Sequence, residues 1–272
     1  MSLTIDELGR VLVQWTVGFA FIYGVIWKVA PKLSKIEERY RATFADNLFN
    51  IPFLPVLCYT AIVGSASLGA SVESRWAETT PESTAFLIMY MSKNIMRSVS
   101  SIALGDSKPG IWLIHIHHIV SVICFGSGLI LGRLHFFGVL DGVCEVSVIF
   151  LNFKLLWRDF ALKQNYIYVI NLHILAFTWF LTRIILFPIW IFIYLYDTYY
   201  YPEISIESVS RMEYFIYPIT TLAIWAMSVK WFVPLMKEVK RTWTGNSYGD
   251  CNRNSYGNSN GSSNGLKNGK EN

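Results

Sequence analysis

A pair of histidines, His117 and His118, lies in an apolar segment that begins near residue 111 and ends near residue 132. Ionisable side chains cost about 2.5–3.5 kcal/mol each at the centre of a membrane helix, so they indicate a functional role by default. An imidazole can act there as a general base or accept an acyl group. We therefore predict His117 and His118 as catalytic residues. His115, beside Trp112 near the membrane interface, is expected to be structural.

The next apolar segment carries the polar residues Asp141, Glu145 and Asn152. At 100° per residue, the three side chains lie within about 40° of one another and share one helix face. We expect this face to point toward protein rather than lipid. Glu145 is predicted to orient His118 and so to complete the catalytic set.

Polar side chains on the neighbouring apolar segments extend this group. At a rise of 1.5 Å per residue, His118, Glu145, Arg97 and His173 lie roughly 10–14 Å from the cytosolic ends of their segments. Arg183 is expected to lie apart from them, nearer the lumenal side. The shared depth predicts a polar chamber in the cytosolic half of the membrane, with apolar walls beyond it, and such a space suits a lipid. The predicted ligand-binding residues are Lys93, Asn94, Arg97, Asp141, Asn152, His173 and Arg183.

The composition of the whole chain is typical of a membrane protein. Of its 272 residues, 53% are hydrophobic and only 15% are charged, which gives more apolar surface than a soluble domain of this size buries. The apolar runs are about 20 residues long and do not alternate as barrel strands do. We predict an all-α fold, a polytopic membrane bundle of about seven transmembrane helices, with residues 166–196 forming one long helix that is either tilted or kinked at Pro188. The seven windows lie near residues 11–29, 47–70, 84–104, 111–132, 134–155, 166–196 and 213–236.

The distribution of charge predicts the orientation. Basic residues such as Lys28 and Lys240 cluster in alternate loops, and positive loops favour the cytosol. The amino terminus, the first helix and a basic loop then form residues 1–39, with the terminus in the lumen. Residues 239–272 are rich in Asn, Gly and Ser and are expected to be a disordered cytosolic tail. The net charge of +4 reflects this loop asymmetry, so no nucleic-acid partner is expected.

Metal chemistry is not expected of this chain. It has five histidines and no His-x-x-His-His cluster, fewer ligands than a di-iron lipid desaturase or hydroxylase uses. No cofactor or metal site is therefore predicted. A transporter is disfavoured because the sequence has no visible inverted repeat.

Three features together resemble the TLC-domain family. They are the pair His117-His118, the run from Asp141 through Glu145 to Asn152, and the element Phe180-x-x-Arg183-x-x-x-x-Pro188. The resemblance covers roughly residues 40–238, which are interpreted as one TLC domain. The family contains ceramide synthases, translocation-associated membrane proteins and smaller TLC-domain-containing proteins.

The resemblance implies a helical fold around a central lipid-sized cavity, and a location in the endoplasmic reticulum. In the ceramide synthase branch it also implies acyl transfer from acyl-CoA to a sphingoid base, dependent on the histidine pair that His117 and His118 match. The synthases carry a His-Asp-x-x-Asp stretch before a glutamate, whereas this chain has Val139-Leu140-Asp141-Gly142. It is therefore more similar to the small TLC-domain-containing proteins, whose roles concern membrane lipids.

Two functions follow as hypotheses, and whether the protein is an enzyme stays open between them. The first is a protein that binds, senses or remodels membrane lipids, which would be its partners. The alternative is a ceramide-synthase-like N-acyltransferase that uses acyl-CoA as a substrate. There one histidine would act as the base or acyl acceptor, Glu145 would orient it, and Arg97 or Lys93 would hold a phosphate or carboxylate.

Overall fold

The structure is a computed structural model that describes residues 4–33, 38–104, 111–160 and 166–243. Residues 239–243, predicted as the start of a disordered tail, are instead the last residues of the final described helix, which ends at Trp243. The rest of the predicted tail lies outside the described residues, as does part of the basic loop near residue 35. Every regular element in the described ranges is helical, which confirms the predicted all-α class.

The helices follow one another along the chain with short connections. They are α1 (Ile5–Leu33), α2 (Glu38–Leu68), α3 (Val72–Ala77), α4 (Pro81–Ala103), α5 (Ile111–Leu131), α6 (His135–Gly142), α7 (Glu145–Asp159), α8 (Tyr166–Trp179), a π-helical segment η1 (Phe180–Ile185), α9 (Leu186–Tyr200), α10 (Pro202–Ser205) and α11 (Arg211–Trp243).

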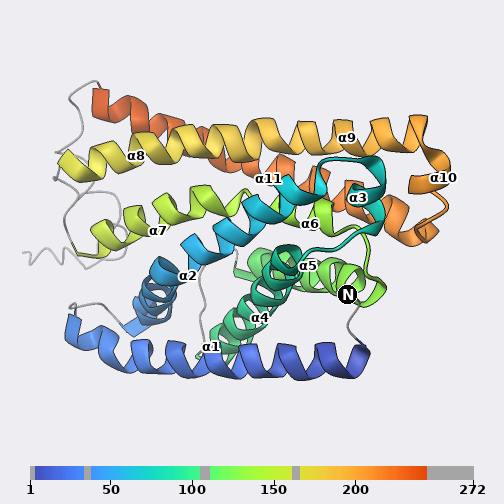
Figure 1. The fold of residues 1–272 in the computed structure, drawn as a ribbon. Helices are drawn as coiled ribbons and strands as arrows, with labels where there is room; N and C mark the ends of the chain where they lie inside the picture. Colours follow the sequence, from blue (N-terminus) through green and yellow to red (C-terminus); the bar gives the residue numbers. More distant parts are fainter. Residues whose placement is uncertain (1–3, 34–37, 105–110, 161–165, 244–272) are drawn as a thin grey trace, which may run out of the picture.

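The long helix α2 is the central element of the bundle. It packs against α1, α4, α6 and α7, while α4 also packs against α1 and α5. Figure 1 shows α1 along one side and the α8–α9 rod along the opposite side, with α2, α4 and α7 between them. The short helices α3 and α10 lie together at one end, which we call the α3–α10 end. The opposite end, where α7 finishes and α8 begins, is the α7–α8 end.

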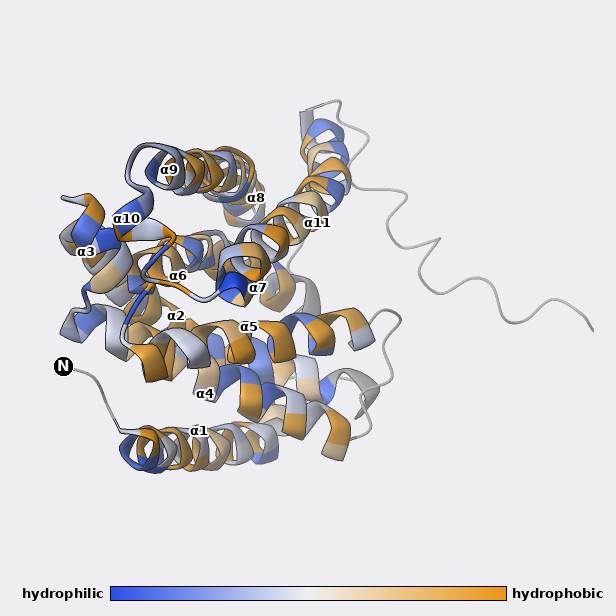
Figure 2. Cartoon of the chain, turned by 90° about the vertical axis from the view of Figure 1, so that its right-hand side faces the viewer, coloured by the Kyte–Doolittle hydropathy of each residue, from blue (hydrophilic) through white to orange (hydrophobic). Residues whose placement is uncertain are grey.

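Six helical stretches of the described chain are long and apolar enough to cross a membrane. They are α1, α2, α5, α6 with α7, α8 through α9, and α11. Apolar residues run along α5 and α8, whereas α3 and α10 carry hydrophilic ones (Figure 2). The remaining predicted window, residues 84–104, corresponds to α4, which carries Lys93 and Arg97 among residues that are mostly buried. Because its polar side chains face other helices, α4 fits inside the bundle without being uniformly apolar, and the count of seven spans stays a prediction.

The predicted helix over residues 134–155 is broken in the structure. α6 ends at Gly142 and α7 begins at Glu145, with a turn between them. The break lies where Gly142 meets the buried ring of Phe86, since a Cβ on this glycine would be only 2.0 Å from Phe86 Cζ. The prediction that Asp141, Glu145 and Asn152 share one face assumed a regular helix, and the turn at residues 143–144 interrupts that regularity between Asp141 and Glu145.

The segment predicted as one long helix is confirmed as one continuous helical run, from Tyr166 to Tyr200. The run changes to π-helical geometry over η1, just before Pro188. Proline has no N–H and so cannot bond to the carbonyl four residues earlier. That carbonyl, on Ile184, instead accepts a hydrogen bond from Trp225 Nε1 on α11 at 3.2 Å. The irregular backbone is thus paired by a neighbouring helix.

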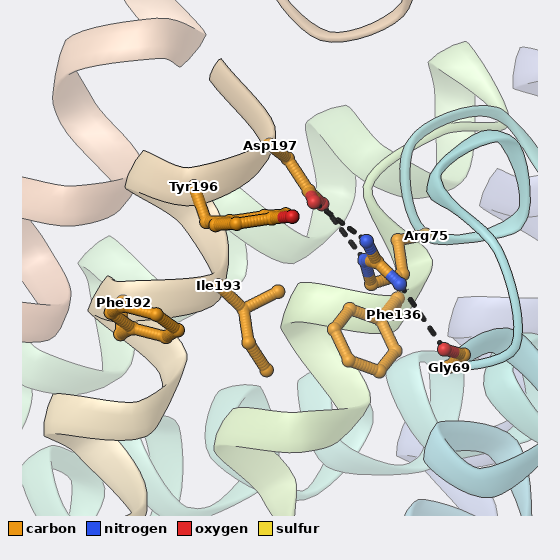
Figure 3. A pocket seen from close by; sticks show the side chains of 7 residues that line it. All are labelled: Gly69, Arg75, Phe136, Phe192, Ile193, Tyr196 and Asp197. Carbon is orange, nitrogen blue, oxygen red and sulfur yellow. Dashed lines mark hydrogen bonds and ion pairs between the residues drawn. The ribbon is translucent and has the colours of Figure 1, made fainter. Parts of the chain in front are cut away.

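An ion pair fastens the α3–α10 end. Arg75 Nε and Nη2 donate to the two oxygens of Asp197 at 2.8 and 2.6 Å, and Arg75 Nη1 donates to the Gly69 carbonyl at 3.2 Å. Trp76 Nε1 donates to the same carboxylate at 2.9 Å. Figure 3 shows Arg75 held between Asp197 and Gly69. The hydrogen bonds to Asp197 raise the pKa of the Arg75 guanidinium above its usual value, so α3 is tied to the end of α9 by a fixed charge pair.

Two pockets border α9 near this end. One, of about 170 Å³, lies beside the Arg75–Asp197 pair and is lined by Phe136, Phe192 and Tyr196 among others (Figure 3). The other, of about 520 Å³, lies among the tyrosines at the end of α9. Neither is lined by a predicted site residue, so the central lipid-sized cavity stays a prediction.

Candidate functional site

Glu145 is the centre of a buried charged group between three elements. Its side chain, at the first turn of α7, is 8% exposed. Lys93 Nζ from α4 lies 3.5 Å from Glu145 Oε2, and Arg183 Nη2 from η1 lies 4.0 Å from Glu145 Oε1. We call these three residues the Glu145 cluster. Among the described residues, these two cations are the ion-pair partners of Glu145. The structure therefore brings together three of the predicted site residues.

Arg183 joins this cluster through the π-helical segment. The prediction that it lies apart from the other charged groups is wrong. A π-helical turn adds a residue to the turn and redirects the side chains that follow, and such turns are frequent at functional sites. Arg183 Nε also donates to Ser147 Oγ at 2.9 Å, and its guanidinium lies 4.6 Å from the centroid of the Trp179 ring. Its position is thus fixed by an anion, a hydroxyl and an aromatic ring.

A second ion pair lies one helical turn along α4 from Lys93. Arg97 Nε is 3.3 Å from Asp46 Oδ2 on α2. Sequence reasoning missed Asp46 because the apolar window was taken to begin at residue 47, and it assigned no role to Asn47 and Asn50 inside that window. The spacing of these three polar residues, one and then three positions apart within a membrane-length helix, could have revealed them.

The other predicted residues of the fifth window point to different neighbours. Asn152 Oδ1 accepts from Asn50 Nδ2 at 3.3 Å, so it faces α2. Asp141 Oδ2 accepts from Thr221 Oγ1 on α11 at 3.5 Å, so it faces the opposite side of the bundle. Asn152 therefore lies near the Arg97–Asp46 level of α2, whereas Asp141 is separated from the Glu145 cluster by the turn between α6 and α7.

The two adjacent histidines face different helices. His118 Nδ1 is 3.0 Å from Ser98 Oγ on α4, and His115 Nε2 is 3.5 Å from Ser101 Oγ on the same helix. His118 is therefore turned toward α4 and is not paired with Glu145 as predicted. The ring of His117 lies 5.8 Å from that of His118, centroid to centroid. Because neighbours in a helix differ by about 100°, His117 points elsewhere.

Both adjacent histidines lie near charges of the Glu145 cluster. Glu145, Arg183 and Lys93 are near enough to influence the His117 ring electrostatically, and Lys93 also influences His118. The side chain of His117 is half-buried, and its backbone carbonyl accepts a hydrogen bond from Ser121 Oγ at 2.9 Å. Of the two histidines, His117 is the one that Glu145 influences, whereas His118 is bonded to α4.

His173 lies outside this group. Its Nδ1 is 2.7 Å from the Val169 carbonyl, and its Nε2 accepts from Trp243 Nε1 at 2.6 Å. The two rings stack with centroids 5.9 Å apart, near the α7–α8 end. The predicted depth was close to that of the cluster, but the rotation of α8 directs His173 to α11 instead.

Asn94, the last of the predicted ligand-binding residues, is 2% exposed, and its Nδ2 has no hydrogen-bond partner among the described residues. Across the described ranges, no three His, Cys, Asp or Glu side chains gather closely enough to hold a metal ion. The arrangement offers two cations, a carboxylate, amides and imidazoles. The Glu145 cluster has two cations to one carboxylate and carries an excess positive charge.

Comparison with known families gives one match. A family model described as the TLC domain matches residues 42–237, from the first turn of α2 to near the end of α11. The match contains the whole Glu145 cluster and both adjacent histidines, while α1 precedes it. No curated protein matches the chain.

Proposed function

Because this chain belongs to the TLC-domain family and is a multi-pass membrane protein, we propose that it binds a membrane lipid, with an anionic headgroup at the Glu145 cluster. The observation that carries the proposal is the burial of Lys93, Glu145 and Arg183 between apolar helices. Such charges are costly in a membrane interior and mark functional sites by default.

The charge balance favours an anionic headgroup. Lys93 and Arg183 share one carboxylate, so one positive charge is left without an anion in a medium of low dielectric constant. A phosphate supplies that anion and accepts the N–H groups that Glu145 leaves free, because a guanidinium presents five donors in a planar fork. The acyl chains would extend among the apolar helices. This supports a role in lipid homeostasis, as a protein that binds, senses or remodels lipids.

The orientation and organelle belong to the same proposal. Basic residues at the α7–α8 end, including Lys154 and Lys240, favour the cytosol for that end and for the carboxyl terminus. The endoplasmic reticulum is the location that the family resemblance suggests.

Mass spectrometry of the lipids that remain bound to the purified protein tests this proposal. We expect the full chain to retain an anionic phospholipid, and Arg183→Gln to retain at least five-fold less. Arg75→Gln is the matched control, since it also removes a buried arginine from a carboxylate, but at the α3–α10 end. Equal retention by both variants and the unaltered chain would reject the Glu145 cluster as the headgroup site.

An acyl-transfer activity is the second candidate, favoured by the position of His117 near Glu145. His117 would remove a proton from the amine of an acceptor as its nitrogen attacks the thioester carbon of acyl-CoA. The amide bond forms, the carbon–sulfur bond breaks, and CoA leaves as the thiolate, which takes up the proton. Lys93 or Arg97 would hold a phosphate of CoA.

Release of free CoA from acyl-CoA and a long-chain amine measures this activity. We expect His117→Ala to abolish turnover and His118→Ala to reduce it less, because His118 is bonded to Ser98. A rate of CoA release by the unaltered protein that does not exceed that of His117→Ala would exclude the transferase and leave the binding function.

A further inference from the structure

One face of α2 carries a row of polar residues whose hydrogen bonds are incomplete. Thr43, Asp46, Asn47 and Asn50 are spaced by three, one and three positions, so they form a single stripe. Each has a buried side-chain atom without a hydrogen-bond partner in the described part of the chain: Oγ1, Oδ1, Nδ2 and Oδ1, respectively. Asn47 and Asn50 are only 3% and 4% exposed.

The side of α4 that faces α2 has one atom with the same property. Asn94 Nδ2 is buried and has no hydrogen-bond partner among the described residues, and Asn94 is 2% exposed. Asn94 lies about 60° around the helix from Arg97, whose ion pair with Asp46 joins α4 to α2. We call these five residues, Thr43, Asp46, Asn47, Asn50 and Asn94, the polar seam.

The polar seam connects the α7–α8 end with the Glu145 cluster. From Thr43 to Asn50 it extends for roughly 10 Å along α2, at a rise of 1.5 Å per residue. Asn50 bonds to Asn152 on α7, and Asn94 adjoins Lys93, the partner of Glu145. The seam therefore starts within the first turns of α2 and ends beside the buried charges.

Buried polar groups in folded proteins are almost always hydrogen-bonded, and groups that find no protein partner are commonly bonded to internal water. The unpaired atoms of the polar seam include both acceptors and donors: Asp46 Oδ1 and Asn50 Oδ1 accept hydrogen bonds, whereas Asn47 Nδ2 and Asn94 Nδ2 donate them. An anionic headgroup would be repelled by the carboxylate of Asp46, and an apolar chain would form hydrogen bonds with none of these atoms. Water donates and accepts and fits both kinds.

We propose that the polar seam between α2 and α4 is a water-filled inlet that leads from the α7–α8 end to the Glu145 cluster. Through it, protons and water reach charges that the apolar helices otherwise enclose. The proposal does not depend on which lipid the protein binds, or on whether it is catalytic.

The reactivity of introduced cysteines tests the inlet in the full chain in membranes. The probe is methyl methanethiosulfonate, a small reagent whose sulfur is attacked by the cysteine thiolate to form a mixed disulfide, with methanesulfinate as the leaving group. A thiol ionises far more readily in water than in apolar surroundings. We expect Asn47→Cys and Asn50→Cys to react at least ten-fold faster than Leu54→Cys, which lies one turn further along the same face and is 1% exposed. Ile51→Cys, at an exposed position on another face of α2, is the second control. The unaltered chain gives the background of its own cysteines.

A second substitution tests whether the reactivity of the introduced cysteine depends on water in the inlet. In the Asn50→Cys background, Asn47→Leu places an apolar side chain in the inlet, and we expect it to lower the reaction rate to that of Leu54→Cys. Rates for Asn47→Cys and Asn50→Cys that equal the Leu54→Cys rate would show a dry seam and overturn the proposal. This result would not affect the proposal that the Glu145 cluster binds a lipid headgroup, so the two proposals can be refuted separately.

Discussion

Replacing Lys93 by methionine and Glu145 by glutamine, singly and together, measures the coupling within the Glu145 cluster. At an effective dielectric constant of about 20, charges 3.5 Å apart attract by about 5 kcal/mol before desolvation is counted. Breaking a buried pair by removing one partner costs about 3–5 kcal/mol, because the other charge stays buried. We expect each single change to cost about 3 kcal/mol and the double change about 4 kcal/mol. The coupling energy is then about 2 kcal/mol.

Thermal unfolding of the purified protein in one detergent provides the assay. A loss of 3 kcal/mol corresponds to a fall in Tm of about 6–12 °C for a chain of this size. The control cycle combines Lys93→Met with Asp197→Asn, which belong to separate ion pairs, so the two effects should add within about 0.5 kcal/mol. A coupling energy below about 0.5 kcal/mol between Lys93 and Glu145 would refute the reasoning, because the two groups would then not share a buried site.

Two further predictions concern the backbone that positions the cluster. Gly142→Ala should destabilise the protein by about 1–3 kcal/mol, because its Cβ would overlap the buried ring of Phe86. Gly24→Ala, whose Cβ would have no neighbour within 4 Å, should not destabilise it, and thermal unfolding of both variants checks this. Trp225→Phe should cost about 1–3 kcal/mol, since the Ile184 carbonyl loses its donor. A Tm unchanged by Trp225→Phe would mean that this carbonyl finds another partner.

Much of the polar site could be predicted from residue types alone. Lys93, Glu145 and Asn94 interrupt apolar windows, and their cost in a membrane indicates that they meet other polar groups. All three are buried in the structure. The all-α class followed in the same way from continuous apolar runs of membrane length.

The directions of these side chains could not be predicted. Counting depth at 1.5 Å per residue assumes regular helices, and that assumption failed at the π-helical segment that carries Arg183 and at the turn after Gly142. The rotation of α5 was also hidden, since nothing in the pair His117-His118 tells which of the two rings contacts Ser98 on α4. These choices are made by contacts between residues far apart in the chain, such as Gly142 with Phe86.

An experimental density map of the full chain, determined in nanodiscs that contain anionic phospholipids, tests the central claim most directly. The account predicts a phosphate within about 4 Å of both Arg183 and Lys93, the reach of a charge-assisted contact. A map in which Glu145 alone occupies these two cations, with phospholipid only around the outside of the bundle, would contradict it.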